Sequence, residues 1–424
     1  MQRRQLNWSL LTLSSGSLPL LQTGCASRSK RRGHVVVIGG GFAGTTCARQ
    51  LKKLDNHLEV TLIEARPTYT ACPLSNLVVV GQRQLKAQNF NYSRLKDDEI
   101  LVIHDHVIGV DPQKQRVVLN NGQSLGYDRL VVAPGVDIAW NQLSGYDEKA
   151  AQIMPHAWKA GPQTLLLQQQ IASMKDGGLV LISAPENPFR CPPGPYERAS
   201  LIAHYLKRYK PKSKLIILDA KDNFSKKPLF LEAWQKHYGD LIEWQGLSSG
   251  ARVTQVNAAS KEVLTDFDTF KADVINIVPP QRAGKIAEIA GCTNASGWCP
   301  IGASTFASQI QDKVYVLGDA AIANAMPKSA FSANAQAKLC AIQIVRNLQE
   351  LPPINTKLIN TCYSYVTPTQ AISVADIYTP KENIWQPVAH AGGISQPNAG
   401  DLLQQLEAKY ALDWFKVTTQ EVFG

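Results

Sequence analysis

The segment PFRCPPGPYERAS, residues 188–200, places one cysteine among prolines and a glutamate six residues later. An apolar run over residues 178–183 predicts a strand before it, and a helical pattern begins near Tyr196. At this position a nucleotide-binding βαβ unit has a glycine-rich turn whose backbone N–H groups bind phosphate. Proline fixes φ and lacks an N–H, so this loop is a poor phosphate site. We expect it instead to hold Cys191 rigidly, as a thiolate or disulfide sulfur that exchanges electrons.

Glu197 falls in the first turn of the helix that follows this loop. The helix dipole stabilises an ionised carboxylate there, so Glu197 accepts protons only if burial raises its pKa. Two plainer interpretations stay open: Cys191 as a buried structural cysteine, and Glu197 as an ordinary acid at a helix N-terminus.

A dinucleotide-binding motif stands near the N-terminus. The apolar run 34–38 leads into GGGFAG, residues 39–44, and a helical pattern over 45–54 follows. In G-x-G-x-x-G the first glycine allows a tight turn, the second lets the backbone approach a pyrophosphate, and the third lets helix and strand pack closely. A second predicted strand, 58–63, is followed by an acid that suits a ribose. The candidate contacts are Gly39, Gly41, Phe42, Ala43, Gly44, Glu64 and Ala65.

Two later segments indicate which dinucleotide binds. Residues 127–135 (YDRLVVAPG) and 313–320 (KVYVLGDA) each read as a strand that ends in a turn of small residues. Both resemble the flavin disulfide-reductase-like superfamily, in which the aspartate of the Gly-Asp turn, here Asp319, binds the ribityl chain of FAD. An acid at the carboxyl end of a strand suits polyol hydroxyls. FAD is therefore the expected cofactor, with Pro134, Gly135, Gly318 and Asp319 as further contacts.

The order of these elements predicts an α/β protein with two Rossmann-like βαβ domains of the disulfide-reductase type and a C-terminal α+β interface domain. The inserted second domain lacks its own G-x-G-x-x-G, so we expect no nicotinamide site in it. The predicted boundaries are 1–32 for an export signal and linker, 33–150 and 281–350 for the FAD domain, 151–280 for the inserted domain, and 351–424 for the C-terminal domain. In the last of these, residues 402–415 predict an amphipathic helix.

Charge and the N-terminus bear on partners and location. The chain has 424 residues and a net charge of +10, and residues 1–33 contribute six positive charges and no acid. The remainder is too weakly basic for a nucleic-acid-binding protein. Arg3-Arg4 ahead of a short apolar stretch resembles a twin-arginine export signal, which predicts a periplasmic protein without a transmembrane span. The box LQTGC makes Cys25 a candidate lipid-attachment site, with a disordered cytosolic tail as the alternative for the whole segment.

The eight cysteines are too few for a disulfide scaffold, and they lack the paired short spacing of a zinc site, so no metal site is predicted. Cys47 and Cys340 fall on helical patterns and are expected to pack in the core. A surface disulfide between Cys292 and Cys299 stays open. His156 is expected to be structural rather than catalytic.

Long stretches of the chain together resemble the flavoprotein subunit of flavocytochrome c sulfide dehydrogenase. The resemblance implies that Cys191 and Cys362 are a redox-active pair beside the flavin and that Glu197 handles protons there. It also implies that Cys72 carries FAD through a thioether, although Ala71 and Pro73 depart from the family pattern around that cysteine. The matching segments are residues 69–76, 155–161, 188–200, 277–287, 318–333 and 360–364.

The same resemblance implies oxidation of sulfide to zero-valent sulfur or polysulfide, with electrons passed from FAD to a c-type cytochrome subunit. This chain has no Cys-x-x-Cys-His motif, so the haem is expected on a separate polypeptide. A sulfide:quinone oxidoreductase, which shares the fold and a cysteine pair, is the main alternative. The other two are an NADH-dependent reductase, against which the missing nicotinamide turn argues, and a non-enzymatic flavoprotein or sulfur-binding partner.

Overall fold

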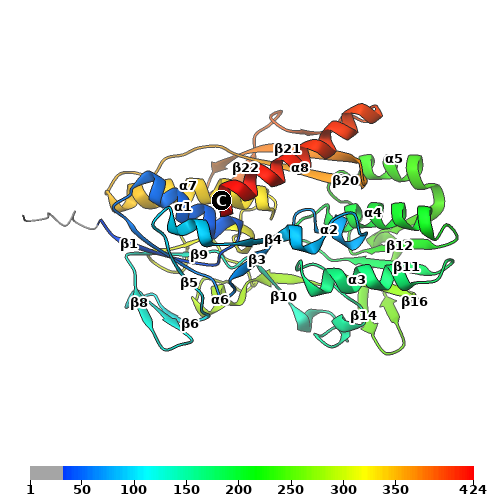
Figure 1. Cartoon of the computed structure of the whole chain (residues 1–424), viewed down its shortest axis with the longest axis horizontal. Coiled ribbons are helices and arrows are strands. Elements are labelled where there is room, and N and C mark those ends of the chain that lie inside the picture. The colour runs from blue at the N-terminus through cyan, green and yellow to red at the C-terminus, as the bar shows by residue number, and fades with distance from the viewer. Residues whose placement is uncertain (1–31) are drawn as a thin grey trace, which may run out of the picture.

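The computed structural model describes residues 32–424. The twin-arginine segment and the candidate lipid site at Cys25 lie outside these residues. Within them, no helix has the length and apolar character needed to cross a bilayer, and no three His, Cys, Asp or Glu side chains gather as a metal ion would require. The described chain has two parallel-sheet layers, and an antiparallel layer contacts helices of both (Figure 1).

The first sheet carries the predicted dinucleotide site. Its five strands are parallel, in the order β19-β9-β1-β2-β5. Apolar runs such as HVVVI form a sheet of this kind because both of its faces are buried. Ile38 pairs with both Ile63 and Val132, so three of the strands end at one edge. The elements are β1 (His34–Ile38), α1 (Phe42–Leu54), β2 (Glu59–Ile63), β5 (Leu101–Ile103), β9 (Arg129–Val132), β19 (Val314–Val316) and α7 (Ala330–Leu348).

Strand β19 pairs with β9, which places residues 314–316 in a sheet otherwise built from residues 34–132. Helix α1 starts at Phe42, three residues before the predicted start, because Gly41 already serves as its N-cap. Shorter elements complete this part of the chain: β3 (Thr68–Thr70), α2 (Ser75–Val79), β4 (Asn89–Asn91), β6 (Val107–Asp111), β7 (Arg116–Leu119), β8 (Ser124–Gly126), β10 (Val136–Ile138), β18 (Gln281–Ala283) and α6 (Lys285–Ile289).

The second parallel sheet has four strands in the order β13-β12-β11-β17. Strand β11 leads through the proline-rich loop into α4, as the sequence predicts, although α4 begins at Gly194, two residues before Tyr196. The elements are α3 (Pro162–Ser173), β11 (Leu179–Ala184), α4 (Gly194–Tyr209), β12 (Lys214–Asp219), α5 (Lys227–Tyr238), β13 (Ile242–Gln245), β14 (Val253–Asn257), β15 (Glu262–Thr265), β16 (Thr269–Lys271) and β17 (Val274–Ile277).

The C-terminal segment forms an antiparallel sheet and one long helix. Strand β20 packs against both α4 and α7, and α8 packs along β20 and β21 and against α1. In Figure 1 this layer runs across the top of the molecule, from α7 toward α5. Its elements are β20 (Leu358–Thr367), β21 (Gln370–Lys381), β22 (Ile384–Pro387), β23 (Gly393–Ile394) and α8 (Asp401–Phe423). Helix α8 is longer than the predicted 402–415, since Phe415 and Phe423 are both buried.

The cysteines outside the predicted site lie in the core. The surface disulfide considered for Cys292 and Cys299 is wrong, because both are free thiols and fully buried. Cys299 is held inside by a β-bridge to Ala321. Cys47 and Cys340 are fully buried on α1 and α7, two helices that pack together, as predicted.

Candidate flavin and redox site

A cavity of about 400 Å³ lies at the carboxyl edge of the first sheet, between the two parallel-sheet layers and the C-terminal segment. This volume is typical of a cofactor site. Two predicted residues do not line it: Gly44, which packs α1 against the strand, and Ala65, which follows Glu64. The predicted residues that do line it are Gly39, Gly41, Phe42, Ala43, Glu64, Cys72, Pro134, Gly135, Cys191, Glu197, Gly318, Asp319 and Cys362.

The glycine turn has no room for side chains at two of its positions. Gly39 has φ +102°, and a Cβ there would lie 2.3 Å from the Ala133 carbonyl oxygen. A Cβ on Gly44 would lie 1.9 Å from the Gly39 carbonyl oxygen. The Glu64 carboxylate accepts a hydrogen bond from the Gly40 N–H at 2.8 Å, which fixes the turn against the end of β2. The start of α1 is therefore open to a pyrophosphate, with Glu64 at hand for a ribose.

Asp319 supplies the next part of the cavity wall. Its Oδ1 is buried and has no hydrogen-bond partner within the described residues 32–424. Burial raises the pKa of this carboxyl, while the positive charges of Arg190 and Lys328 lower it. A buried carboxylate oxygen without a partner is costly, and polyol hydroxyls would satisfy it. The residues present thus fit FAD, and Asp319 is the residue that would hold its ribityl chain.

Lys328, which the sequence did not single out, links the Gly-Asp turn to the redox loop. Its Nζ donates to the carbonyl oxygens of Asp319 at 2.7 Å and Ala321 at 2.8 Å. The same ammonium lies 3.9 Å from the centre of the Trp298 ring. Burial lowers the pKa of Lys328 to about 8. The backbone carbonyl oxygen of Lys328 accepts a hydrogen bond from the Cys191 N–H at 2.9 Å. Lys328 therefore connects the Gly-Asp turn on one side of the cavity to the loop of Cys191 on the other.

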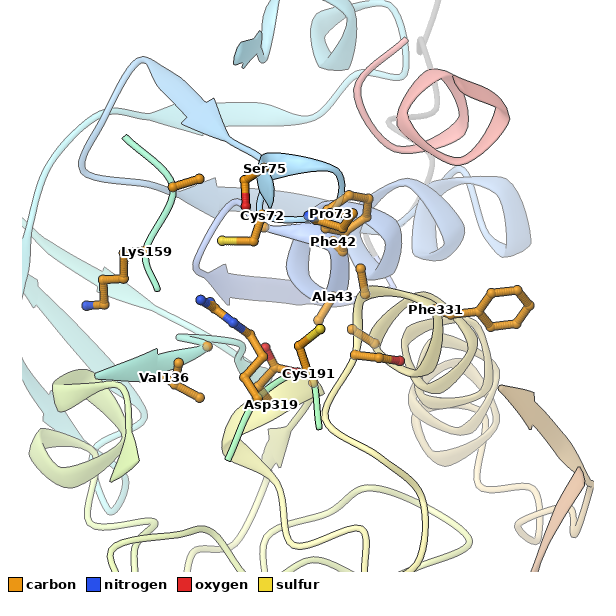
Figure 2. A pocket seen from close by; sticks show the side chains of 18 of the residues that line it. Phe42, Ala43, Cys72, Pro73, Ser75, Val136, Lys159, Cys191, Asp319 and Phe331 are labelled. Atoms are coloured by element: carbon orange, nitrogen blue, oxygen red, sulfur yellow. The ribbon is translucent and has the colours of Figure 1, made fainter. Parts of the chain in front are cut away.

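The proline-rich loop holds Cys191 in an unusual backbone conformation. Its φ is +57°, in the left-handed region, which costs a residue other than glycine about 1–3 kcal/mol. The Cys191 carbonyl oxygen accepts a hydrogen bond from the Gly194 N–H at 2.8 Å. A Cβ on Gly194 would lie 2.7 Å from the Trp158 ring and 3.1 Å from the Cys191 sulfur. Figure 2 shows Cys191, Asp319 and Cys72 around one space, each from a different segment.

Cys362 reaches the same cavity from β20. Both Cys191 and Cys362 are free thiols in this structure, and both are partly exposed. Burial raises the pKa of each thiol, and the charge of Cys362 raises that of Cys191 further. The structure therefore brings the predicted pair into electrostatic contact without a bond between them.

Glu197 is buried beside the two cysteines. One carboxylate oxygen accepts from the Asn76 amide at 3.0 Å, and the other accepts from the Tyr365 N–H at 3.2 Å. Burial raises the pKa of Glu197, and these two hydrogen bonds oppose the rise. From the sequence, the helix dipole would lower the pKa of Glu197 and burial would raise it. In the folded protein burial has the larger effect on this pKa. Glu197 is therefore suited to exchanging protons in the cavity.

Arg198 positions this acid and the neighbouring loop. Its guanidinium is buried and donates to the Asn76 side chain at 3.0 Å and to the Ala157 carbonyl oxygen at 2.6 Å. It also lies 5.1 Å from the centre of the Trp158 ring. His156 has the predicted structural role: its Nδ1 accepts from the Trp158 N–H at 2.9 Å, and burial lowers its pKa to about 3.

Cys72 lies between β3 and α2, with Pro73 also facing the cavity and Ala71 fully buried. Its sulfur is 3.9 Å from the Trp158 carbonyl oxygen. Arg190, beside Cys191 in sequence, also lines the cavity and donates to that same carbonyl oxygen. The thiol and a guanidinium thus face the space that a flavin would fill.

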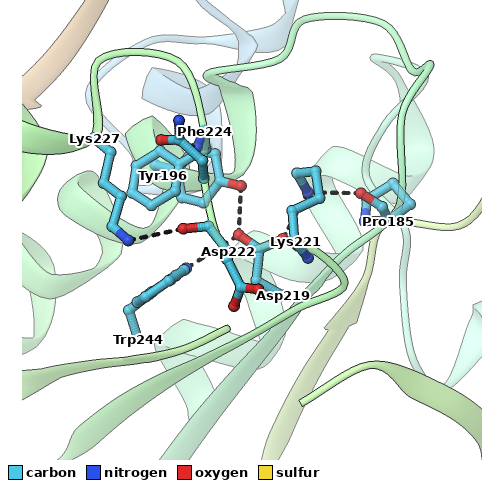
Figure 3. A network of polar contacts seen from close by, with 9 residues as sticks. Pro185, Tyr196, Asp219, Lys221, Asp222, Phe224, Lys227 and Trp244 are labelled. Carbon is cyan, nitrogen blue, oxygen red and sulfur yellow. Dashed lines mark hydrogen bonds and ion pairs between the residues drawn. The ribbon is translucent and has the colours of Figure 1, made fainter. Parts of the chain in front are cut away.

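The position that would bind a ribose in the second parallel sheet is already occupied by protein groups (Figure 3). Asp219 ends β12, and its carboxylate is fully buried. It accepts hydrogen bonds from the Tyr196 hydroxyl at 2.6 Å, the Trp244 indole at 3.0 Å and the Lys221 ammonium at 2.6 Å. Both Asp219 oxygens are thus engaged by protein groups, and the prolines of the neighbouring loop lack N–H donors for phosphate.

The fold and the cavity define a flavoprotein of the FAD/NAD(P) disulfide-reductase-like class. A pyridine nucleotide-disulphide oxidoreductase model matches residues 33–160. The structure is similar to that of the sulfide:quinone oxidoreductase from Aquifex aeolicus, with a TM-score of 0.74, 18% identity and 92% of each chain covered. A mitochondrial sulfide:quinone oxidoreductase from Dictyostelium discoideum is 22% identical over 325 residues, 72% of this chain and 70% of the relative.

Two further models identify the family. The central model of the sulfide dehydrogenase (flavocytochrome c) flavoprotein chain matches residues 164–279, and the flavocytochrome c sulphide dehydrogenase flavin-binding model matches residues 354–423. The flavoprotein chain of this enzyme from Chlorobaculum thiosulfatiphilum is 50% identical over 45 residues, which are 11% of this chain and 94% of that sequence. The chain belongs to the family of flavocytochrome c sulfide dehydrogenase flavoprotein chains.

Proposed function

We propose that this flavoprotein oxidises sulfide to zero-valent sulfur or polysulfide and passes the electrons to a c-type cytochrome subunit. The observation that carries the proposal is the meeting of Cys191 and Cys362 in a cavity that also presents Asp319 and the glycine turn. Membership of the sulfide dehydrogenase family supports the same substrate and the same kind of partner.

The chain's own residues account for the sulfur chemistry. Hydrosulfide attacks the oxidised Cys191–Cys362 pair: a new sulfur–sulfur bond forms to one cysteine, the disulfide bond breaks, and the other cysteine leaves as a thiolate. Glu197 accepts the proton from the persulfide, since its raised pKa suits it to that exchange. A second hydrosulfide then removes the outer sulfur of the persulfide as a disulfide anion and leaves both cysteines reduced. Asp319 and the glycine turn would hold FAD, which would supply the two-electron oxidation that restores the Cys191–Cys362 disulfide and would pass the electrons singly to a haem.

The acceptor separates this proposal from its main alternative, a sulfide:quinone oxidoreductase. The fold is common to both kinds of enzyme, so similarity to the sulfide:quinone oxidoreductases does not separate them. Membership of the flavocytochrome c family favours a cytochrome as the electron acceptor. The bonds to Asp219 argue against NADH as the electron source. A non-enzymatic role would leave the strained conformation of Cys191 without a purpose.

Anaerobic mixing with hydrosulfide tests the proposal through the absorbance of the flavin. We expect rapid bleaching in the native protein and loss of bleaching in Cys191→Ser, while Cys340→Ala, which alters a buried cysteine outside the cavity, behaves like the native protein. Cytochrome c should then restore the oxidised spectrum and a soluble quinone should not. Full sulfide:cytochrome c activity in Cys191→Ser would refute the mechanism, and reoxidation by the quinone alone would establish the alternative.

We propose further that FAD is attached covalently through Cys72. Support comes from the place of this thiol on the cavity wall, beside the space that the flavin would fill. After acid precipitation, the yellow colour should stay with the native protein and go into the supernatant from Cys72→Ala. Colour released from the native protein would contradict the attachment.

We also propose that the protein is exported to the periplasm, on the twin-arginine pattern of residues 3–4. A covalent cofactor fits export in the folded state, because lost FAD could not readily be replaced outside the cytoplasm. Replacement of both arginines by lysine should hold the protein in the cytoplasmic fraction. Cys25→Ser should release it from membranes if this cysteine carries a lipid, and an unchanged distribution would contradict lipid attachment.

A further inference from the structure

Lys226 is a buried lysine that the sulfur chemistry described above does not use. It precedes α5, has φ +63°, and its side chain is almost entirely inaccessible. Its Nζ donates to the Cys362 carbonyl oxygen at 3.0 Å, the Ser364 hydroxyl at 2.8 Å and the Ile372 carbonyl oxygen at 3.4 Å. These bonds place the Lys226 ammonium directly behind the strand that presents Cys362. Burial lowers the pKa of Lys226, and the nearby thiol of Cys362 and carboxyl of Glu197 oppose that fall, so the charged form depends on anions in the cavity.

All three acceptors are neutral. Among residues 32–424, no carboxylate forms an ion pair with this ammonium. An ammonium buried without an anionic partner costs several kcal/mol. The Lys226 ammonium would therefore stabilise an anion in the cavity. The stabilisation would be greatest for the nearest group that can become negatively charged.

Four titratable groups lie within reach of the Lys226 charge: the thiols of Cys362 and Cys191, the carboxyl of Glu197, and Glu407 on α8. Glu407 already accepts from the Ser395 hydroxyl at 2.7 Å and the Ser373 hydroxyl at 2.9 Å. Cys362, whose own carbonyl is bonded to Lys226, has the leading electrostatic effect on it.

The two cysteines differ in the charges around them. The pKa of the Cys362 thiol is raised by burial and lowered by Lys226, with a smaller rise from Glu197. The pKa of the Cys191 thiol is raised by burial, by Cys362 and by Glu197, with Arg190 and Lys226 opposing. Tyr378 on the neighbouring strand β21 also interacts with the charge of Cys362, but a tyrosine adds no positive charge that would stabilise the thiolate. The surroundings thus favour the thiolate at Cys362.

We propose that Lys226 is a positioning residue for sulfide oxidation, whose ammonium stabilises Cys362 as the leaving thiolate and so directs hydrosulfide to Cys191. This inference rests on the proposed function. The electron pair of hydrosulfide forms the bond to the Cys191 sulfur, and the Cys191–Cys362 bond breaks with its electron pair kept by Cys362. The sulfur-bound proton stays on the persulfide until Glu197 accepts it. No oxidant beyond the chain's own FAD is required.

Alkylation of the reduced, FAD-containing protein by iodoacetamide tests the inference without sulfide. Mass spectrometry resolves the two cysteines, and the rate is followed against pH because only the thiolate reacts. In the native protein Cys362 should be alkylated at lower pH than Cys191. In Lys226→Met, alkylation of Cys362 near neutral pH should slow by about tenfold, and Lys226→Arg should keep most of the native rate.

Lys210→Met is the matched control, because Lys210 is also buried, donates to the Ala172 carbonyl oxygen at 2.9 Å, and lies outside the cavity. It should leave the alkylation profile unchanged. An unchanged profile in folded Lys226→Met would overturn the inference. If Lys226→Met does not fold, the native profile decides: alkylation of Cys191 at lower pH than Cys362 overturns the inference as well. Failure of the native flavin to bleach with sulfide would instead refute the proposed function, whatever the alkylation shows.

Discussion

Asp319→Asn should weaken FAD binding while stabilising the protein without its cofactor. The substitution keeps the shape of the side chain and an acceptor oxygen but removes the charge. Asp319 Oδ1 is buried with no hydrogen-bond partner among residues 32–424, so this oxygen gains its hydrogen bonds only when the ribityl hydroxyls donate to it, although Arg190 and Lys328 offset part of its charge. The cofactor-free and cofactor-bound forms should therefore respond in opposite directions.

The size of the effect follows from hydrogen bonds to a charged acceptor, which contribute about 1.5–3 kcal/mol. Loss of that contribution raises the Kd for FAD by about 10- to 150-fold. In the cofactor-free protein, burial raises the pKa of Asp319. An acid with a raised folded pKa destabilises the fold as pH rises from its unfolded value of about 4 through its folded value. At neutral pH the Asn variant should thus have the higher Tm.

The assay is fluorescence titration of FAD into protein carrying Cys72→Ala, so that covalent attachment does not hide a change in Kd. Glu407→Gln, which removes another buried carboxylate but one outside the cavity, is the matched control. It should leave the Kd unchanged. If Asp319→Asn binds FAD as tightly as its parent, or lowers the Tm of the cofactor-free protein, the assignment of Asp319 to the ribityl chain is refuted.

Three further substitutions test other parts of the site. Gly44→Ala places a Cβ 1.9 Å from the Gly39 carbonyl oxygen, so the purified protein should lack FAD, whereas Gly393→Ala, with open space around it, should retain the native absorbance. Lys328→Met removes two hydrogen bonds to the Gly-Asp turn and should raise the Kd for FAD about tenfold in the same titration. Glu197→Gln should gain in Tm relative to the native protein as pH rises from about 4, because the native carboxyl has a raised folded pKa and must ionise at a cost that the amide avoids. A parallel pH dependence of Tm in the two proteins would contradict that reasoning.

The parts of the site that depend on local geometry could be predicted from the sequence. Gly39 and Gly44 must be glycine because a Cβ at either position would collide with a backbone carbonyl oxygen, and both lie in one recognisable six-residue motif. Proline at residues 192 and 193 removes phosphate donors whatever the rest of the chain does. The α/β class follows in the same way from apolar runs that alternate with helical patterns, and the structure confirms it.

The parts that depend on contacts between distant segments could not be predicted in this way. Lys226 lies in a polar stretch, KDNFSKKP, where a lysine is normally exposed. It is buried only because β20, more than a hundred residues later, packs over it. Arg198 likewise gains its acceptors from Asn76 and Asn276, which are remote in sequence. Arg190 differs from Lys226 and Arg198, because its position next to Cys191 in the sequence could have indicated that it lines the cavity.

The missing glycine-rich turn and the cysteine site are one structural feature of the second parallel sheet. Cys191 takes the positive φ that a glycine would have in a phosphate-binding turn, and its sulfur packs where Gly194 leaves room at the start of α4. Tyr196, in the first turn of the same helix, donates to Asp219, the acid that would otherwise accept a ribose. A glycine-rich loop grafted in place of residues 188–193 would therefore remove the redox cysteine without creating an NADH site, because Asp219 would remain saturated. NADH binding by such a graft, measured as quenching of its fluorescence, would show that the prolines alone exclude the nucleotide.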